Sequence, residues 1–91
     1  MMLLPLTKLA KNELGVIREI NEDLLPNGSD LMHGEIEAHL LEMGFIEGAQ
    51  IKVLHWGAFG HDPIAVRINN SSSLVSLRKT EASIIMVERI K

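Results

Sequence analysis

The sequence contains no cysteine among its 91 residues. This absence excludes disulfide bonds, thiolate metal sites and cysteine nucleophiles, and it suits a reducing compartment. The aromatic side chains are those of Phe45, Trp56 and Phe59, too few for a surface that stacks on nucleic-acid bases. No apolar run is long enough to cross a membrane, and the opening segment lacks the basic flank of a secretory signal. We therefore expect a cytoplasmic protein.

Basic residues are also missing from the middle of the chain. From Glu19 to Glu47 there are eight acidic residues and no lysine or arginine. Residues 48–91 instead carry six lysine or arginine residues against three acidic ones. Such an asymmetry is typical of a solvated acidic face, and it can also orient a protein on a charged partner. Because the net charge is −3 and the bases are scattered, we expect no nucleic-acid partner.

The segment Pro26–Ser29 has the composition of a turn, and we expect it to form a loop. After it, apolar residues recur at the spacing of an α-helix. Ile36, Leu40 and Met43 recur at i, i+4 and i+7, so they form one apolar stripe. This spacing predicts a helix from about Leu31 to Met43.

Both ends of this helix have residues suited to stop it. Ser29 or Asp30 can supply the N-cap oxygen. At the other end, Gly44 is expected to adopt a left-handed C′ conformation, and Gly48 then permits a sharp entry into the next strand. Phe45–Ile46, between the glycines, can fold back onto the core. We interpret the glycines as structural.

The remaining apolar segments have the composition or alternation of strands. The expected strands are Leu14 to Ile20, the Ile51/Val53 segment, the Ile64 to Asn69 segment, Leu74 to Leu77 and Ile84 to Ile90. The cluster Asn69 to Ser73 is expected to be a hairpin turn. One helix and about five short strands predict a mainly β fold, a small bent barrel whose closure removes exposed edges, as a single domain over residues 1–91.

One segment has the residue types of a metal site. On a helix, Glu35 and His39 lie one turn apart and suit Zn²⁺ or Fe²⁺, whereas His33 is poorly phased with them. A closed site needs about four ligands. We therefore favour a solvated acidic face and assign no metal, with His33, Glu35, Glu37 and His39 as the candidate ligands if one binds.

His61 and Asp62 have the residue types of a base and its orienting carboxylate. No motif fixes a nucleophile near them, and adjacent strand residues point to opposite faces. A turn at Gly60 to Pro63 is the preferred interpretation. The sequence also lacks a phosphate loop, a dinucleotide fingerprint and a zincin signature. The residues predict a binding module without a cofactor, not an enzyme.

Several short motifs follow one another along nearly the whole chain. They are Pro5-Leu6-x-x-Leu9, Gly15-x-x-x-x-Ile20, Leu41-x-Met43-Gly44-x-x-x-Gly48, Ala58 to Pro63-Ile64-Ala65-Val66, Leu77-Arg78-Lys79-x-Glu81-Ala82 and Ile85-x-Val87. This order resembles the FeoA family, the small cytoplasmic ferrous-iron transport proteins A. The structural positions that the resemblance marks are Gly15, Gly44, Gly48, Pro63, Leu77, Arg78 and Ala82.

Two turns depart from the family pattern. The opening turn of the family usually has a glycine where Asn12 stands, and asparagine is the next-best residue for a left-handed turn. The family's Ala-Pro-Leu-Gly-Asp-Pro hairpin is replaced by the different sequence of Ala58 to Pro63, which leaves the shape of that turn open.

The resemblance implies a Src-homology-3-like (SH3-like) barrel with a helix inserted after the first strand. It also implies a non-enzymatic accessory protein that binds FeoB. FeoB is a membrane permease with a cytoplasmic GTP-binding part, so the protein would contact the membrane only indirectly, through the permease. Whether such a protein regulates GTP hydrolysis, assembles the permease or stabilises it stays open, as does weak self-association. The residues expected to contact the partner are Leu41, Met43, Gly44, Phe45, Trp56 and Phe59. For Trp56 and Phe59, packing in the core or at its rim stays open, and so does whether Leu41 and Phe45 face the core or the partner.

Leu41 is the residue of this set on which the hypothesis depends most. It lies off the stripe of Ile36, Leu40 and Met43, so it is expected to be an exposed apolar anchor. The alternative function is a metal-sensing or metal-handling module, related to the SH3-like domains of iron-dependent repressors. That module would use the His33 to His39 segment to ligate iron.

Overall fold

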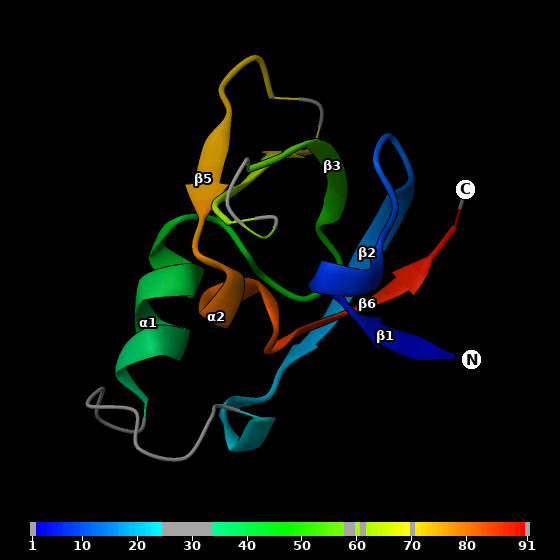
Figure 1. The fold of residues 1–91 in the computed structure, drawn as a ribbon. Coiled ribbons are helices and arrows are strands. Elements are labelled where there is room, and N and C mark those ends of the chain that lie inside the picture. The colour runs from blue at the N-terminus through cyan, green and yellow to red at the C-terminus, as the bar shows by residue number, and fades with distance from the viewer. Residues whose placement is uncertain (1, 25–33, 58–59, 61, 70, 91) are drawn as a thin grey trace.

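The computed structural model describes residues 2–24, 34–57, 60, 62–69 and 71–90. Its centre is a six-stranded antiparallel sheet in the order β1-β6-β2-β3-β4-β5 (Figure 1). The strands are β1 Leu3–Pro5, β2 Leu14–Ile20, β3 Gln50–Trp56, β4 Ile64–Ile68, β5 Val75–Leu77 and β6 Ile85–Arg89. The α-helices are α1 Glu35–Glu42 and α2 Lys79–Ala82, and the 3₁₀ helices are η1 Leu6–Lys8 and η2 Glu22–Leu24. The mainly β prediction is therefore confirmed.

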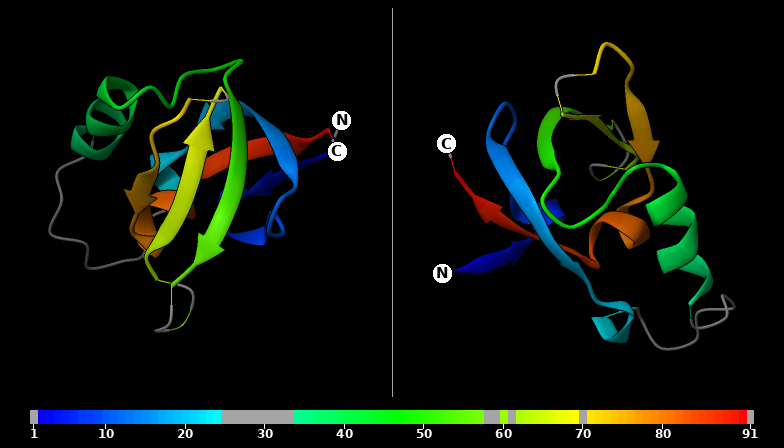
Figure 2. Two further views of the ribbon diagram at one scale, coloured as in Figure 1. Left: turned by 90° about the horizontal axis from the view of Figure 1, so that it is seen from above. Right: turned by 180° about the vertical axis from the view of Figure 1, so that it is seen from behind.

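The sheet bends strongly, as Figure 2 shows, with β3 and β4 crossing the direction of β6 and β1. Register shifts between Ile17 and Glu19 in β2 and between Val53 and His55 in β3 contribute to this bend, because a bulge increases local twist. The predicted closure of the barrel is wrong. In the described part of the chain, β1 and β5 stand at opposite edges of the sheet and do not pair with each other.

The strand of residues 14–20 has its predicted bounds but is the second strand, because Leu3–Pro5 comes first and pairs with β6. The sequence did not predict the strand Leu3–Pro5, because three residues that include a proline are too few to show the alternation of a strand. Its place at the edge of the sheet suits Pro5, which cannot donate a ladder hydrogen bond.

The core includes buried side chains of β3 and β4. Ile51 and Val53 of β3 and Ile64 and Val66 of β4 are all 0% exposed, as the strand alternation predicts. Gly15 is buried where β2 approaches β6. A Cβ at this position would lie 3.2 Å from the Cβ of Val87, so the glycine permits a close approach of the strands.

The positions that the family resemblance marks near α2 are buried or cap the helix. Leu77 and Ala82 are both 0% exposed. Arg78 is the N-cap residue of α2, and its backbone N–H donates to the carboxylate of Glu81 at 2.8 Å. Pro63 is exposed and directly precedes β4.

The beginning of α1 differs from the prediction. The helix begins at Glu35, not near Leu31, and Gly34 is its N-cap residue; Ser29 and Asp30 lie outside the described residues. The carboxylate of Glu22 takes the place of a local cap. It accepts hydrogen bonds from the backbone N–H groups of Gly34 and, at 2.7 Å, of Glu37. A carboxylate suits the N-terminus of a helix, where free N–H groups and the helix dipole concentrate positive charge.

The glycines of the joint after α1, the segment from Gly44 to Gly48, adopt the predicted left-handed conformation. Gly44 has a φ of 100° and Gly48 a φ of 91°, so both glycines adopt the backbone region that side chains with a Cβ rarely occupy. Asn12 stands in for glycine in the opening turn, with a φ of 70°. The joint turns the chain back, and the backbone N–H of Phe45 donates to the carbonyl oxygen of Leu40 at 3.0 Å.

Candidate functional site: a groove between α1 and β2

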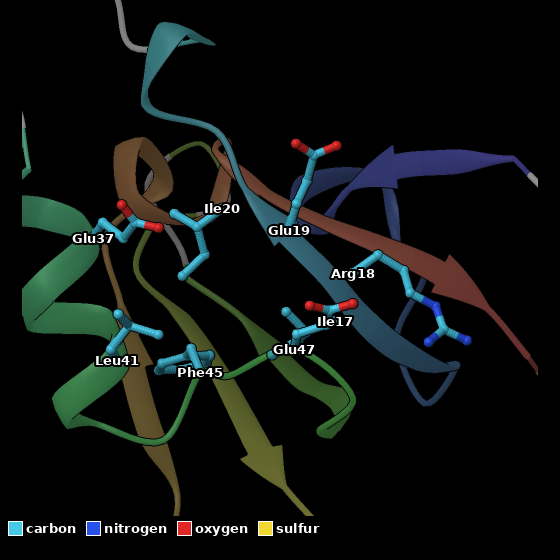
Figure 3. A pocket seen from close by; sticks show the side chains of 8 residues that line it. All are labelled: Ile17, Arg18, Glu19, Ile20, Glu37, Leu41, Phe45 and Glu47. Atoms are coloured by element: carbon cyan, nitrogen blue, oxygen red, sulfur yellow. The ribbon is translucent and has the colours of Figure 1, made fainter.

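A groove of about 310 Å³ lies between α1 and β2 (Figure 3). Strand β2, helix α1 and the joint that follows the helix all contribute side chains to it. The lining residues are Ile17, Arg18, Glu19, Ile20, Glu37, Leu41, Phe45 and Glu47.

The floor of the groove is apolar. Ile17 is 1% exposed and Phe45 is 0% exposed. Ile20, on the β2 side of the groove, packs against the core. Ile17 and Ile20 are three residues apart, a spacing that places side chains on opposite faces of a regular strand. The register shift between Ile17 and Glu19 breaks that alternation, and both isoleucines line the groove.

Leu41 forms the helix side of the groove. Its side chain points from α1 towards β2 in Figure 3, and the residue is 45% exposed. The predicted stripe explains this position. Ile36 and Leu40 are buried, and Leu41, the residue after Leu40, points away from the buried face because successive residues turn around the helix axis. The exposure that the sequence predicted for Leu41 is therefore confirmed.

The joint residues behave differently from the prediction. Phe45 was expected either to fold back onto the core or to contact the partner. It is fully buried, because Gly44 turns the chain so that the ring enters the core and forms the floor of the groove, and its place among exposed partner contacts is corrected. Ile46 was expected to fold back onto the core as well, but it is 50% exposed. Met43 is half-buried and packs against the core, and Gly44 is half-buried in the turn.

The rim of the groove is negatively charged. Glu19, Glu37 and Glu47 are exposed, and none of them is in an ion pair within the described residues. Arg18 lines the groove but points away from it in Figure 3. Its Nη2 lies 2.7 Å from Oε1 of Glu88, so its charge is already compensated. The groove therefore has an acidic rim around a buried apolar floor, and the apolar surface it leaves to solvent is mainly that of Leu41 and of half-buried Ile20.

Trp56, which was also predicted to contact the partner, does not line this groove. Trp56 lines a different pocket, of about 240 Å³, together with Thr7, Lys8, Ile64 and Lys79. Phe59 lies outside the described residues. The structure thus brings Leu41 and the joint together and places Trp56 elsewhere.

The candidate metal ligands are divided between two places. Glu37 faces the groove, whereas Glu35 and His39 line a depression of about 230 Å³ with Ile36 and Glu81 of α2. Nε2 of His39 lies 4.0 Å from Oε2 of Glu81. His33 lies outside the described residues, and among the residues that are described no three histidine or acidic side chains are placed to hold a metal ion.

Asp62 has a structural contact that the sequence did not reveal. Its Oδ1 accepts a hydrogen bond from the backbone N–H of Lys79 at 3.0 Å, so it caps α2 from a distant turn. His61 lies outside the described residues. No helix in the described ranges combines the length and the apolarity needed to cross a bilayer.

These features define a small protein with an SH3-like sheet, an added helix and an open groove between helix and sheet. The FeoA domain family model matches residues 4–89, and the chain therefore belongs to the FeoA family. The resemblance seen in the motifs is confirmed. Members of this family are accessory proteins of ferrous iron transport, and the chain is accordingly involved in that process.

Solved structures of FeoA proteins have the same fold. The FeoA-like protein from Clostridium acetobutylicum is 24% identical with a TM-score of 0.76, and the match covers 100% of this chain and 91% of that chain. Iron(II) transport protein A from Clostridium thermocellum is 28% identical with a TM-score of 0.75, and the match covers 96% of this chain and 46% of that chain. Stenotrophomonas maltophilia FeoA, a prokaryotic SH3 domain protein solved in complex with zinc, is 21% identical with a TM-score of 0.71, over 93% of this chain and 89% of that chain.

Part of a metal-dependent repressor also has this fold. A manganese-dependent transcriptional repressor, in complex with manganese, is 16% identical with a TM-score of 0.79. The match covers 99% of this chain and 38% of that chain. A comparison with curated proteins gives no match.

Proposed function

We propose that this protein acts in the cytoplasm as a non-enzymatic accessory of ferrous iron uptake, and that it does so by binding the FeoB permease. Membership of the FeoA family supports the link to iron uptake. The observation that carries the contact is Leu41, a leucine that remains 45% exposed beside an apolar floor. Exposed apolar side chains next to a groove are typical of surfaces that a partner covers.

The size of the effect follows from the exposed part of the leucine. Full burial of a leucine side chain contributes about 1.5–3 kcal/mol. Because Leu41 is 45% exposed, the part left for a partner to cover corresponds to roughly 1 kcal/mol. Leu41→Ala should therefore weaken binding about fivefold. Leu41→Glu should weaken it about tenfold or more, because a carboxylate would also be desolvated on the apolar floor.

The measurement is a calorimetric titration of these variants with the purified cytoplasmic part of FeoB. Leu74→Glu is the matched control, since Leu74 is 58% exposed but does not line the groove. Circular dichroism spectra of all variants should match, because both leucines are at the surface. If Leu41→Glu and Leu74→Glu bind as well as the wild type, the proposed contact surface is wrong.

A second candidate function is a metal-handling module. It is favoured by the fold shared with the manganese-dependent repressor and by Glu35 and His39, which line one depression with Glu81. Anaerobic titration with Fe²⁺ tests this function directly. A dissociation constant well below 1 mM, lost in His39→Ala, would support it, whereas binding weaker than about 1 mM, or roughly 4 kcal/mol, would dispose of it.

A further inference from the structure

The groove between α1 and β2 restricts the shape of what it can accept. Leu41 and Ile20 lie on its two sides, and Phe45 and Ile17 close its floor (Figure 3). An apolar side chain placed between them would cover the exposed part of Leu41. A volume of about 310 Å³ is at the lower end of ligand pockets, which hold roughly 300–1,000 Å³, so it suits inserted side chains.

The rim restricts the charge of the occupant. Glu19, Glu37 and Glu47 surround the apolar floor, and no described lysine or arginine pairs with them. A neutral occupant would take these carboxylates partly out of water without a partner, which is unfavourable. An acidic occupant would add repulsion. Only a basic occupant provides hydrogen-bond donors and opposite charge together.

We propose that the groove accepts a basic amphipathic segment of the partner, with an apolar side chain between Leu41 and Ile20 and flanking lysine or arginine side chains paired with Glu37 and Glu47. This inference rests on the proposed function, because it describes the segment through which FeoB is bound. The three rim glutamates belong to a stretch from Glu19 to Glu47 that has eight acidic residues and no lysine or arginine, so the sequence carries a negative local charge. Such a charge speeds the encounter with a basic partner.

The other occupants to compare are a divalent cation and a second copy of this chain. A divalent cation needs several oxygen or nitrogen ligands together, and no group of three candidate ligands exists among the described residues. A second copy of this chain has basic residues on its sheet, where Lys52 and Arg67 face each other across β3 and β4. This alternative is an outcome that the experiment separates.

The experiment is a binding-kinetics titration of Glu37→Lys and Glu47→Lys with the cytoplasmic part of FeoB at low and at physiological salt. Each variant should bind about tenfold more weakly at low salt, mainly through a slower association rate, and the wild-type affinity should fall with salt. Glu42→Lys is the matched control: it changes the same charge on α1 but does not line the groove, and it should bind within about threefold of the wild type. Glu47 lies outside α1, so its variant is free of any effect on the helix dipole.

The outcomes separate this inference from the function on which it rests. No binding by the wild type contradicts the proposed function itself. Binding that weakens in Leu41→Ala but is equal in Glu37→Lys, Glu47→Lys and Glu42→Lys leaves the function intact and overturns the basic segment. Analytical ultracentrifugation of each variant tests whether a second copy of this chain occupies the groove. If the wild type is a dimer, and Glu37→Lys abolishes the dimer without changing FeoB binding, the proposal of a basic FeoB segment is also overturned. Rescue of Glu37→Lys by a lysine-to-glutamate change in the FeoB segment supports it.

Discussion

Glu22 should determine the stability of α1, and through it the shape of the groove. This glutamate is only 8% exposed, and its carboxylate accepts hydrogen bonds from the backbone N–H groups of Gly34 and Glu37. Glu22→Ala removes both acceptors and leaves the first turn of α1 without its cap. Loss of a helix cap costs about 0.5–2 kcal/mol, and hydrogen bonds to a charged group contribute about 1.5–3 kcal/mol.

From these two values we expect Glu22→Ala to lower the free energy of unfolding by about 2–3 kcal/mol. For a chain of this size, each 1 kcal/mol lowers the melting temperature by about 4–8 °C. Glu22→Gln should lose about half as much, because its amide oxygen still accepts one N–H. Urea denaturation followed by the fluorescence of Trp56 measures both variants.

A control and a local measurement make this prediction specific. Glu42→Ala removes an exposed glutamate of the same helix that has no ion pair within the described residues, and it should change stability by less than about 0.5 kcal/mol. Amide hydrogen exchange at Gly34 and Glu37 should be faster in Glu22→Ala than in the wild type. A loss below about 0.5 kcal/mol in Glu22→Ala, with unchanged exchange at both amides, would refute the capping role.

Two further changes test the joint and the sheet. Gly44→Ala should lower the free energy of unfolding by about 1–3 kcal/mol in urea denaturation, because φ is 100° at this position. The added Cβ would lie 3.8 Å from the nearest atom, so the cost comes from the backbone conformation and not from a clash. A cost near zero would show that the backbone relaxes. Lys52→Glu should raise the free energy of unfolding by about 0.5–1 kcal/mol, since it replaces a like-charge pair with Arg67 by an opposite pair; a lower stability would contradict that pairing.

Local signals in the sequence were sufficient for the elements that frame the groove. The strand Leu14–Ile20, the buried stripe of Ile36 and Leu40 and the positive φ of Gly44 all depend on residues close together in the chain. The exposure of Leu41 followed from the same stripe. These features were predictable because spacing and glycine conformation act within one or two turns.

The features that the sequence did not reveal depend on distant contacts. Glu22 caps α1 from 12 and 15 residues away, and Asp62 caps α2 from 17 residues away, so no local capping motif contains them. The groove itself needs the register shift in β2, which sets Ile17 and Ile20 on the same side. A bulge has no reliable sequence signal, so the groove between α1 and β2 was not predicted.

The partner is identified most directly by a pull-down from detergent-solubilised native membranes, with this protein as bait and mass spectrometry of the captured proteins. Leu41→Glu and the control Leu74→Glu serve as parallel baits. The proposed function predicts that FeoB is recovered by the wild type and by Leu74→Glu, and that its recovery falls strongly with Leu41→Glu. Absence of FeoB from the wild-type capture, or equal recovery by all three baits, would contradict a FeoB contact through the groove between α1 and β2.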